Sequence, residues 1–322
     1  MNTIAEIAAV IRKLKSALIF THVRPDGDTV GCGIALSRAL DLLGIRNQLL
    51  NEGEIPEKLS FLKGTEKFLR EPVIDAEGYI CVDTSDEARL GELQSVYANG
   101  VRKGKVTVNI DHHVANTRFA AYNFVRDRAS NCENVAELIR ALGVKEDGQI
   151  SRALMTGMVT DSGGFSHSDV NGDTFREAAL CADGGAEVNA ITYEVFKRQT
   201  KARAQMYAET ISSLRFFLGD ALAIALVTQE KLNRYGLKQD ATEGIVDFAL
   251  SIDSVEVSVC LMEAKRGQYK ASFRSKGKVN VNEVARKFGG GGHILASGCM
   301  LFGDIEEIYD RLSFAVAQAG NL

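Results

Sequence analysis

The feature that constrains this chain most is a short acidic turn between an apolar run and a helical pattern. Residues 17–20 form the apolar run, which is typical of a strand buried on both faces of a parallel sheet. Residues 21–31 form the turn, and the apolar residues after it recur at helical spacing. Ligands bind beyond the carboxyl ends of the strands in open α/β sheets, so the turn lies where chemistry is expected. Its metal-capable side chains are His22, Asp26 and Asp28.

This turn alone has two interpretations. Asp and Gly are common turn formers, so Asp26 and Asp28 would simply shape the backbone while His22 ends a strand. Alternatively, the three side chains form half of a metal site. The rest of the chain decides between these interpretations, because a metal site needs further ligands.

Two further apolar runs and one helical pattern end in metal-capable side chains. The apolar runs cover residues 79–82 and 106–110, and the helical pattern over 149–159 leads to a glycine-rich turn. Strands separated by helical segments predict an α/β fold with a doubly wound parallel sheet in the N-terminal part. We therefore expect the charged residues at these ends to meet at one edge of the sheet. They are Asp83, Asp111, His112, His113 and Asp161.

The length of the chain suggests more than one domain. A chain of 322 residues is long enough for two domains, each with its own core. We predict a metal-binding domain over 1–186, a connection over 187–215, and a smaller α/β domain over 216–322 that faces the first across a cleft. The connection is not enriched in Pro, Ser or Gly, so we expect it to be helical rather than flexible.

Composition excludes several classes of protein. The net charge of −4 argues against a protein that coats long duplex nucleic acid. No apolar run reaches about eighteen residues, and the N-terminus shows an amphipathic pattern rather than a signal core. We therefore expect a cytoplasmic protein without a membrane partner. The six cysteines show no CxxC spacing and are predicted to be reduced core residues.

The C-terminal part contains a basic stretch. Residues 261–292 hold eight Lys and Arg residues but only two Glu residues, which indicates either a solvated face or a local anion site. The tetraglycine run 289–292 indicates either a flexible hinge or a backbone that an anion approaches closely. His167, in the first part of the chain, has two equally good interpretations. It is either a contact residue in the cleft or an ordinary surface residue.

The collected imidazoles and carboxylates, without thiolates, suit manganese better than structural zinc. Four aspartates would nearly balance two divalent ions. Two such ions about 3.5–4 Å apart hold a hydroxide and clamp a phosphoryl group during in-line displacement. We therefore expect two divalent ions as cofactors, with manganese first and magnesium or cobalt as alternatives.

At these residues the sequence resembles the DHH phosphoesterase superfamily, whose name is spelled by residues 111–113. Four separated motifs stand in the family's order, and residues 289–298 look like the substrate-binding motif of the associated DHHA1 domain. The resemblance covers nearly the whole chain. It is strongest to the group of bifunctional oligoribonucleases and 3′-phosphoadenosine 5′-phosphate phosphatases. Two small departures, Cys32 for a common serine and Ser297 for an alanine, remove no ligand.

The resemblance implies a role for each site residue. Asp83 would bridge two ions, His113 would be free to meet the substrate phosphate, and Asp111 would orient an imidazole. The ligands of one ion would be His22, Asp26 and Asp83. The ligands of the other would be Asp28, Asp83, His112 and Asp161. The residues that bind the rest of the substrate would be Arg274, Gly290, Gly291, Gly292 and His293.

The resemblance also implies substrates. The first hypothesis is a phosphoesterase that hydrolyses short RNA oligonucleotides to mononucleotides and removes the 3′-phosphate of 3′-phosphoadenosine 5′-phosphate. A pyrophosphatase and a cyclic or linear dinucleotide phosphodiesterase would use a similar metal set. A non-catalytic nucleotide-binding scaffold on the same fold would be marked by a lost ligand, and none is missing. We leave open whether the chain forms a homodimer.

Overall fold

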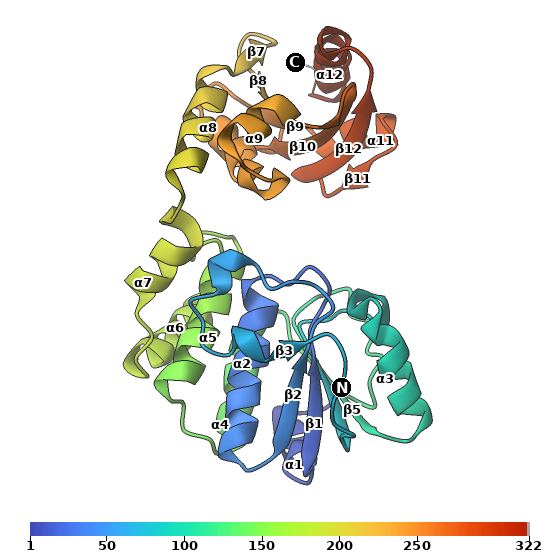
Figure 1. The fold of residues 1–322 in the computed structure, drawn as a ribbon, viewed down its shortest axis with the longest axis vertical. Coiled ribbons are helices and arrows are strands. Elements are labelled where there is room, and N and C mark those ends of the chain that lie inside the picture. The colour runs from blue at the N-terminus through green and yellow to red at the C-terminus, as the bar shows by residue number, and fades with distance from the viewer. Residues whose placement is uncertain (321–322) are drawn as a thin grey trace. The chain divides into compact units, whose positions relative to one another are not determined.

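A computed structural model describes residues 1–320 of the chain. The chain divides into two compact units, Met1–Arg198 and Gln199–Leu322, and each is described here by itself (Figure 1). The division falls inside the stretch 187–215, which the sequence indicates as a connection. Within the described residues, no helix is both long and apolar enough to cross a membrane.

The first unit is built on a six-stranded sheet in the order β3-β2-β1-β4-β5-β6. All of its strand pairs are parallel, which confirms the predicted fold class. The central strands β1 and β4 are buried along their whole length, as expected for a sheet covered on both faces. The strands are β1 (Ser16–Phe20), β2 (Arg46–Leu50), β3 (Phe68–Leu69), β4 (Gly78–Val82), β5 (Val106–Asp111) and β6 (Tyr122–Val125).

Helices cover both faces of this sheet (Figure 1). Ala17 and Ile19 of β1 point into a core shared with α1, α2, α4 and α5, whereas Leu18 and Phe20 point into a second core with α3. The α-helices are α1 (Ile4–Ile11), α2 (Gly27–Leu42), α3 (Leu93–Arg102), α4 (Asn131–Ala141), α5 (Gly148–Asp161), α6 (Gly172–Asp183) and α7 (Val188–Thr192). The short helical turns are η1 (Glu57–Leu59), η2 (Thr65–Lys67), η3 (Glu87–Leu90) and η4 (Tyr193–Lys197).

The second unit contains another six-stranded sheet, in the order β11-β12-β10-β9-β8-β7. Only the β8–β9 pair is parallel among its described strand pairs. Its strands are β7 (Arg215–Phe217), β8 (Leu222–Val227), β9 (Val257–Lys265), β10 (Gln268–Ser275), β11 (Gly291–Gly292) and β12 (Ala296–Phe302).

Helices also cover this second sheet. One core joins the sheet to α11 and α12, and another joins it to α8, α9 and α10. These helical elements are α8 (Lys201–Ser212), α9 (Gln229–Tyr235), η5 (Gln239–Thr242), α10 (Ile245–Leu250), α11 (Val281–Lys287) and α12 (Ile305–Gly320). All six cysteines of the chain are buried and unpaired.

Candidate metal centre

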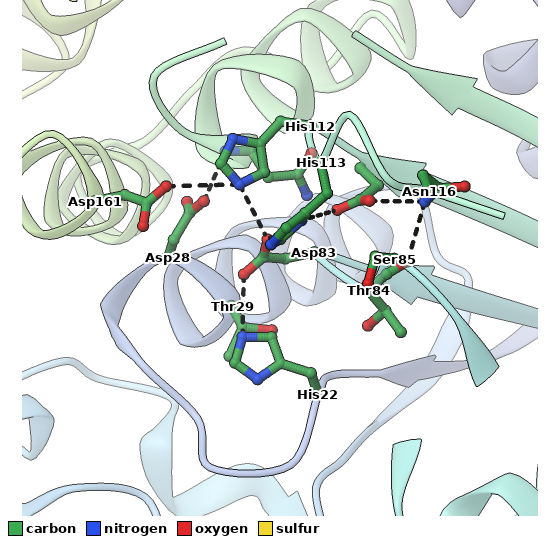
Figure 2. A network of polar contacts seen from close by, with 12 residues as sticks. His22, Asp28, Thr29, Asp83, Thr84, Ser85, His112, His113, Asn116 and Asp161 are labelled. Atoms are coloured by element: carbon green, nitrogen blue, oxygen red, sulfur yellow. Dashed lines mark hydrogen bonds and ion pairs between the residues drawn. The ribbon is translucent and has the colours of Figure 1, made fainter. Parts of the chain in front are cut away.

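Three neighbouring strands bring the predicted metal-capable residues to one edge of the first sheet. β1 pairs with β4, and β4 pairs with β5, so the segments that follow their carboxyl ends lie next to one another. These segments carry His22, Asp83 and the triplet 111–113. The start of α2 and the end of α5 add the remaining carboxylates, Asp26, Asp28 and Asp161. Figure 2 shows Asp28 and Asp161 beside His112.

His22 faces two of these carboxylates through one ring nitrogen. Its Nδ1 lies 2.8 Å from the carbonyl oxygen of Val23, and since a carbonyl only accepts, Nδ1 carries the proton. The other ring nitrogen, Nε2, points toward Asp83 Oδ2 at 3.3 Å and Asp26 Oδ2 at 3.6 Å. Ligand atoms of these three residues lie within 4.8 Å of one another.

His112 repeats this arrangement on the other side of Asp83. Its Nδ1 donates to the carbonyl oxygen of Arg128 at 2.9 Å, and its Nε2 lies 3.5 Å from both Asp83 Oδ1 and Asp161 Oδ2. Asp28, His112 and Asp161 form a second group of ligand atoms within 4.8 Å of one another. The two oxygens of Asp83 thus face two different imidazoles (Figure 2).

The imidazole nitrogens and carboxylate oxygens are spaced for binding cations between them rather than for direct hydrogen bonds to one another. The distances between the imidazole nitrogens and the carboxylate oxygens exceed the 2.7–2.9 Å that is typical of charge-assisted hydrogen bonds. Within the described residues, His22 Nε2, Asp83 Oδ1 and Thr29 Oγ1 are buried without a hydrogen-bond partner. A cation held between imidazole and carboxylate donors would satisfy these atoms, so the residues present fit a divalent metal ion.

The electrostatics of the site also favour positive charge. Burial alone would lower the pKa of His22, but hydrogen bonds and charge from Asp26 and Asp83 raise it to about 10. His112 is partly buried, yet Asp83 and Asp28 raise its pKa to about 11. Among the acids, burial and the charge of Asp28 raise the pKa of Asp161 to about 8. The protein without metal therefore holds protons where cations would bind.

Asp28 is oriented by the N-terminus of α4. Its Oδ2 accepts a hydrogen bond from the backbone N–H of Asn131 at 2.6 Å, and its Oδ1 accepts one from Cys132 at 2.9 Å. Space for this contact comes from Gly157, where a Cβ would lie 2.6 Å from Asp28 Oδ1. Burial and the charge of Asp83 raise the pKa of Asp28 to about 7, and the charge of His112 acts against that rise.

The backbone fixes two other acids. Asp26 is the N-cap of α2, and its Oδ1 accepts hydrogen bonds from Asp28 N at 3.1 Å and Thr29 N at 3.0 Å, which leaves Oδ2 for His22. Asp83 has a positive φ of 54°, a conformation that Asp tolerates better than most residues. Its N–H donates to the carbonyl oxygen of Ile110 at 3.0 Å, which holds the strained residue at the strand end.

His113 stands beside the metal-capable residues in a chain of hydrogen bonds. Its Nδ1 lies 2.9 Å from Oδ1 of the fully buried Asp111. Asn116 Nδ2 donates to the other oxygen of Asp111 at 2.6 Å. On the far side of the ring, Arg89 Nη1 donates to His113 Nε2 at 2.9 Å. We expected His113 to be free to meet the substrate phosphate, but its Nε2 accepts a hydrogen bond from Arg89 in this structure.

Sequence reasoning missed Arg89 and Asn116. Arg89 lies on η3, in the segment that follows β4 and Asp83. Asn116 comes three residues after His113, and this proximity was the only available signal. His167, which the sequence left undecided, is exposed, and its Nδ1 donates to the carbonyl oxygen of Asp161 at 2.9 Å. It thus lies beside one predicted ligand without belonging to either group.

The predicted substrate-binding residues lie together within the second unit. Arg274 on β10 is the cross-strand neighbour of Ala296 on β12, and Gly292 pairs with Ser297 on the same strand. Gly290 and Gly291 precede this pair, and His293 N donates to the carbonyl oxygen of Ala296 at 2.8 Å. Arg274 Nε lies 3.1 Å from Asp247 Oδ1, so its guanidinium already has an acidic partner.

The tetraglycine run is not a free loop. Gly291 and Gly292 form β11, which pairs with β12, so these two residues belong to a strand. A Cβ at Gly290 would lie 2.2 Å from the carbonyl oxygen of Gly298, and Gly292 has a φ of 148°. Close strand packing therefore requires glycine here, which argues against the hinge interpretation.

The fold and this site define a two-unit α/β protein with a candidate centre for divalent metal ions. The chain belongs to the DHH family. The model of the DHH family, N-terminal domain, matches residues 16–160, and the model of the DHHA1 domain matches residues 219–318. The family that the sequence motifs indicated is thus confirmed, and this family suggests the use of divalent metal ions.

Several known proteins are similar to the chain over nearly its whole length. The bifunctional oligoribonuclease and PAP phosphatase NrnA of Thermus thermophilus is 29% identical over 97% of this chain and 93% of its own. The protein of the same name from Bacillus subtilis is 25% identical over 92% of this chain and 93% of its own. The crystal structure of an exopolyphosphatase-related protein from Bacteroides fragilis matches with a TM-score of 0.89 at 24% identity. It covers 99% of this chain and 96% of its own, and it supports the fold alone.

Proposed function

We propose that this protein is a metal-dependent phosphoesterase of short RNA oligonucleotides and small nucleotides in the cytoplasm. It would hydrolyse oligoribonucleotides of a few residues to mononucleotides and remove the 3′-phosphate of 3′-phosphoadenosine 5′-phosphate. The observation that carries this proposal is the position of Asp83 between His22 and His112, which lie 3.3 Å and 3.5 Å from its two oxygens. The activities in the names of the relatives from Thermus thermophilus and Bacillus subtilis support the choice of substrates.

The residues divide between two metal positions that share Asp83. Manganese is the first choice because imidazole and carboxylate donors predominate, with magnesium or cobalt as alternatives. When bound, two such ions would supply a hydroxide near neutral pH and offset the charge of the phosphoryl oxygens. The first position would use His22, Asp26 and Asp83. The second would use Asp28, Asp83, His112 and Asp161.

The chain's own groups would keep these donors in place. The carbonyl oxygens of Val23 and Arg128 hold the two ligand imidazoles in the tautomer whose Nε2 is free. The amides of α4 hold Asp28, and Asp111 holds His113 beside the site. Such fixed supports keep ligands in position before the substrate binds, so little reorganisation accompanies the reaction.

The second unit would bind the remainder of the substrate. Arg274, with the backbone of Gly290 to Gly292 and with His293, offers a local anion site, and a substrate phosphate would compete with Asp247 for the guanidinium. We keep the proposed domains at 1–186, 187–215 and 216–322. The net charge of −4 gives no extended basic track for a long nucleic acid.

A substrate panel with manganese tests the proposal. It would contain 3′-phosphoadenosine 5′-phosphate, RNA of two to about five nucleotides, RNA of about 24 nucleotides, pyrophosphate and cyclic dinucleotides. We expect turnover of the first two and slow turnover of the long RNA at equal nucleotide concentration. A preference for pyrophosphate or cyclic dinucleotides would replace the proposed substrates, and a preference for long RNA would indicate a processive nuclease. No turnover at all would indicate a nucleotide-binding scaffold.

A further inference from the structure

The guanidinium of Arg89 lies beside the candidate metal centre with a histidine as its partner. Arg89 Nη1 is 2.9 Å from His113 Nε2, and no carboxylate among residues 1–320 lies within ion-pair distance of this side chain. Several other arginines of the first unit are paired with acids, such as Arg38 with Asp147. A half-buried arginine whose side-chain partner is an imidazole is therefore unusual in this molecule.

The chemistry of this contact leaves the positive charge of Arg89 without a counter-charge. A guanidinium donates and does not accept hydrogen bonds, so Nε2 of His113 must be the acceptor. The other ring nitrogen then carries the proton that bonds to Asp111 Oδ1 at 2.9 Å. In this arrangement the imidazole is neutral and contributes only a lone pair. The hydrogen bond to His113 is satisfied, but the charge remains available to an anion.

The formal charges around the metal centre indicate where such an anion would bind. In the proposed enzyme, four aspartates and two divalent ions would sum to no formal charge. A phosphodiester adds one negative charge, and Arg89 is a cation in contact with His113 that has no acid as its partner.

The backbone holds Arg89 against the segment that carries His22. The carbonyl oxygen of Arg89 accepts a hydrogen bond from the N–H of Val23 at 2.8 Å. Its own N–H donates to Oδ1 of Asp86, the N-cap of η3, at 3.2 Å. The side chain is thus anchored at its base while its end reaches the imidazole of His113. Such an anchor favours a specific contact over a loosely solvated charge.

We propose that Arg89 is a substrate-binding residue that donates to a non-bridging oxygen of the phosphoryl group at the metal centre. The guanidinium exchanges its bond with His113 Nε2 for a bond to phosphate, which it suits through its planar set of donors. The exchange also frees Nε2 of His113 to face the substrate. This inference rests on the proposed phosphoesterase function, which it deepens by adding a phosphate contact from the first unit.

The test compares Arg89→Ala, Arg89→Lys and the wild-type full-length protein, all loaded with manganese. Arg102→Ala on the exposed side of α3 is the matched control, because it removes an arginine away from the site. Calorimetry gives the Kd of inorganic phosphate and the number of manganese ions bound. Steady-state kinetics on an RNA dinucleotide give kcat and KM, with and without added guanidinium chloride.

We expect Arg89→Ala to bind phosphate about 10–100-fold more weakly, with the manganese stoichiometry unchanged. Arg89→Lys should lose less, because it keeps the charge but not the planar donors. Added guanidinium should restore part of the kcat/KM of Arg89→Ala, while Arg102→Ala behaves as wild type. If Arg89→Ala loses manganese, Arg89→Gln provides the same comparison with a smaller change in volume.

Failure of this inference differs from failure of the proposed function. Unchanged phosphate affinity in Arg89→Ala, with normal turnover or with turnover that guanidinium does not rescue, overturns the substrate contact and leaves the phosphoesterase in place. A wild-type protein that turns over no member of the substrate panel, yet binds phosphate through Arg89, refutes the proposed function and supports the contact. A wild-type protein that neither binds phosphate nor turns over any member of the panel overturns both.

Discussion

The carboxylate of Asp83 lies 3.3 Å from His22 through one oxygen and 3.5 Å from His112 through the other. Both imidazoles hold their Nδ1 protons against backbone carbonyl oxygens, so both direct Nε2 at the same aspartate. Near neutral pH and without metal, each Nε2 carries a proton, so two positive charges face the carboxylate. The pKa of Asp83 is accordingly lowered: burial opposes the change, but hydrogen bonds and charge from both imidazoles outweigh it.

The first prediction concerns this shared residue. Asp83→Asn removes one negative charge and one ligand oxygen, and Asn also tolerates the φ of 54°. We expect the number of bound manganese ions to fall from two to at most one, and turnover to fall by more than about 100-fold. Calorimetric titration with manganese and an assay on an RNA dinucleotide would measure both. Near-normal activity in Asp83→Asn would rule out the two-ion proposal.

The second prediction concerns protons. The pKa values of His22 and His112 are raised to about 10 and about 11, so both are protonated near pH 7 in the absence of metal. Metal binding requires their neutral forms and the ionised form of Asp161, so it should release at least two protons, and affinity for manganese should rise with pH. Calorimetry in two buffers of different ionisation enthalpy counts the released protons. Binding without proton release would contradict this view of the site.

The raised pKa values also determine whether the stability of the protein rises or falls with pH. His22 has a higher pKa in the folded chain than its ordinary value of 6.5, so the folded state binds this proton more tightly. Its stabilising contribution is fully present below about pH 6.5 and is lost as the pH rises through about 10. The metal-free protein should therefore lose stability in this range, as measured by denaturant unfolding, and the manganese-loaded protein should lose less.

The third prediction concerns the support behind His113. Asn116 Nδ2 donates to Asp111 Oδ2 at 2.6 Å, and Asn116→Ala would leave that buried oxygen without this donor. We expect the free energy of unfolding to fall by about 1–3 kcal/mol. Asn116→Asp should cost more, because it places a second carboxylate against Asp111. Thermal unfolding of the wild type and both variants checks this order. If Asn116→Ala is as stable as the wild type, the contact with Asp111 is dispensable for stability.

Much of the metal centre could be predicted from the sequence because of the geometry of a parallel sheet. Residues at the carboxyl ends of neighbouring strands meet at one edge, so apolar runs followed by His or Asp indicate a common site. Arg89 could not be found in this way, because its contact with His113 joins two loops that no spacing rule relates. The strands β3 and β11 have only two residues each, which is too short for a hydrophobic pattern.

The tetraglycine run shows a different limit of sequence reasoning. Glycine permits a hinge, a loop around an anion, or close contact between strands, and the residue type alone does not choose among them. The choice depends on Gly298 and Cys299, which a Cβ at Gly290 would approach within 2.2 Å and 2.4 Å. Such contacts become visible only when the neighbouring strand is placed.

The last prediction separates binding from turnover. Arg274 pairs with Asp247 at 3.1 Å in the second unit, whereas His113 stands beside the metal-capable residues of the first. We expect Arg274→Ala to raise KM about 10-fold or more with a smaller change in kcat, because its proposed contact is with a phosphate away from the cleaved bond. His113→Ala should mainly lower kcat. Asp247→Ala is the control, since it frees Arg274 from its partner and should lower KM or leave it unchanged. A loss of kcat without a change in KM for Arg274→Ala would contradict this division of roles.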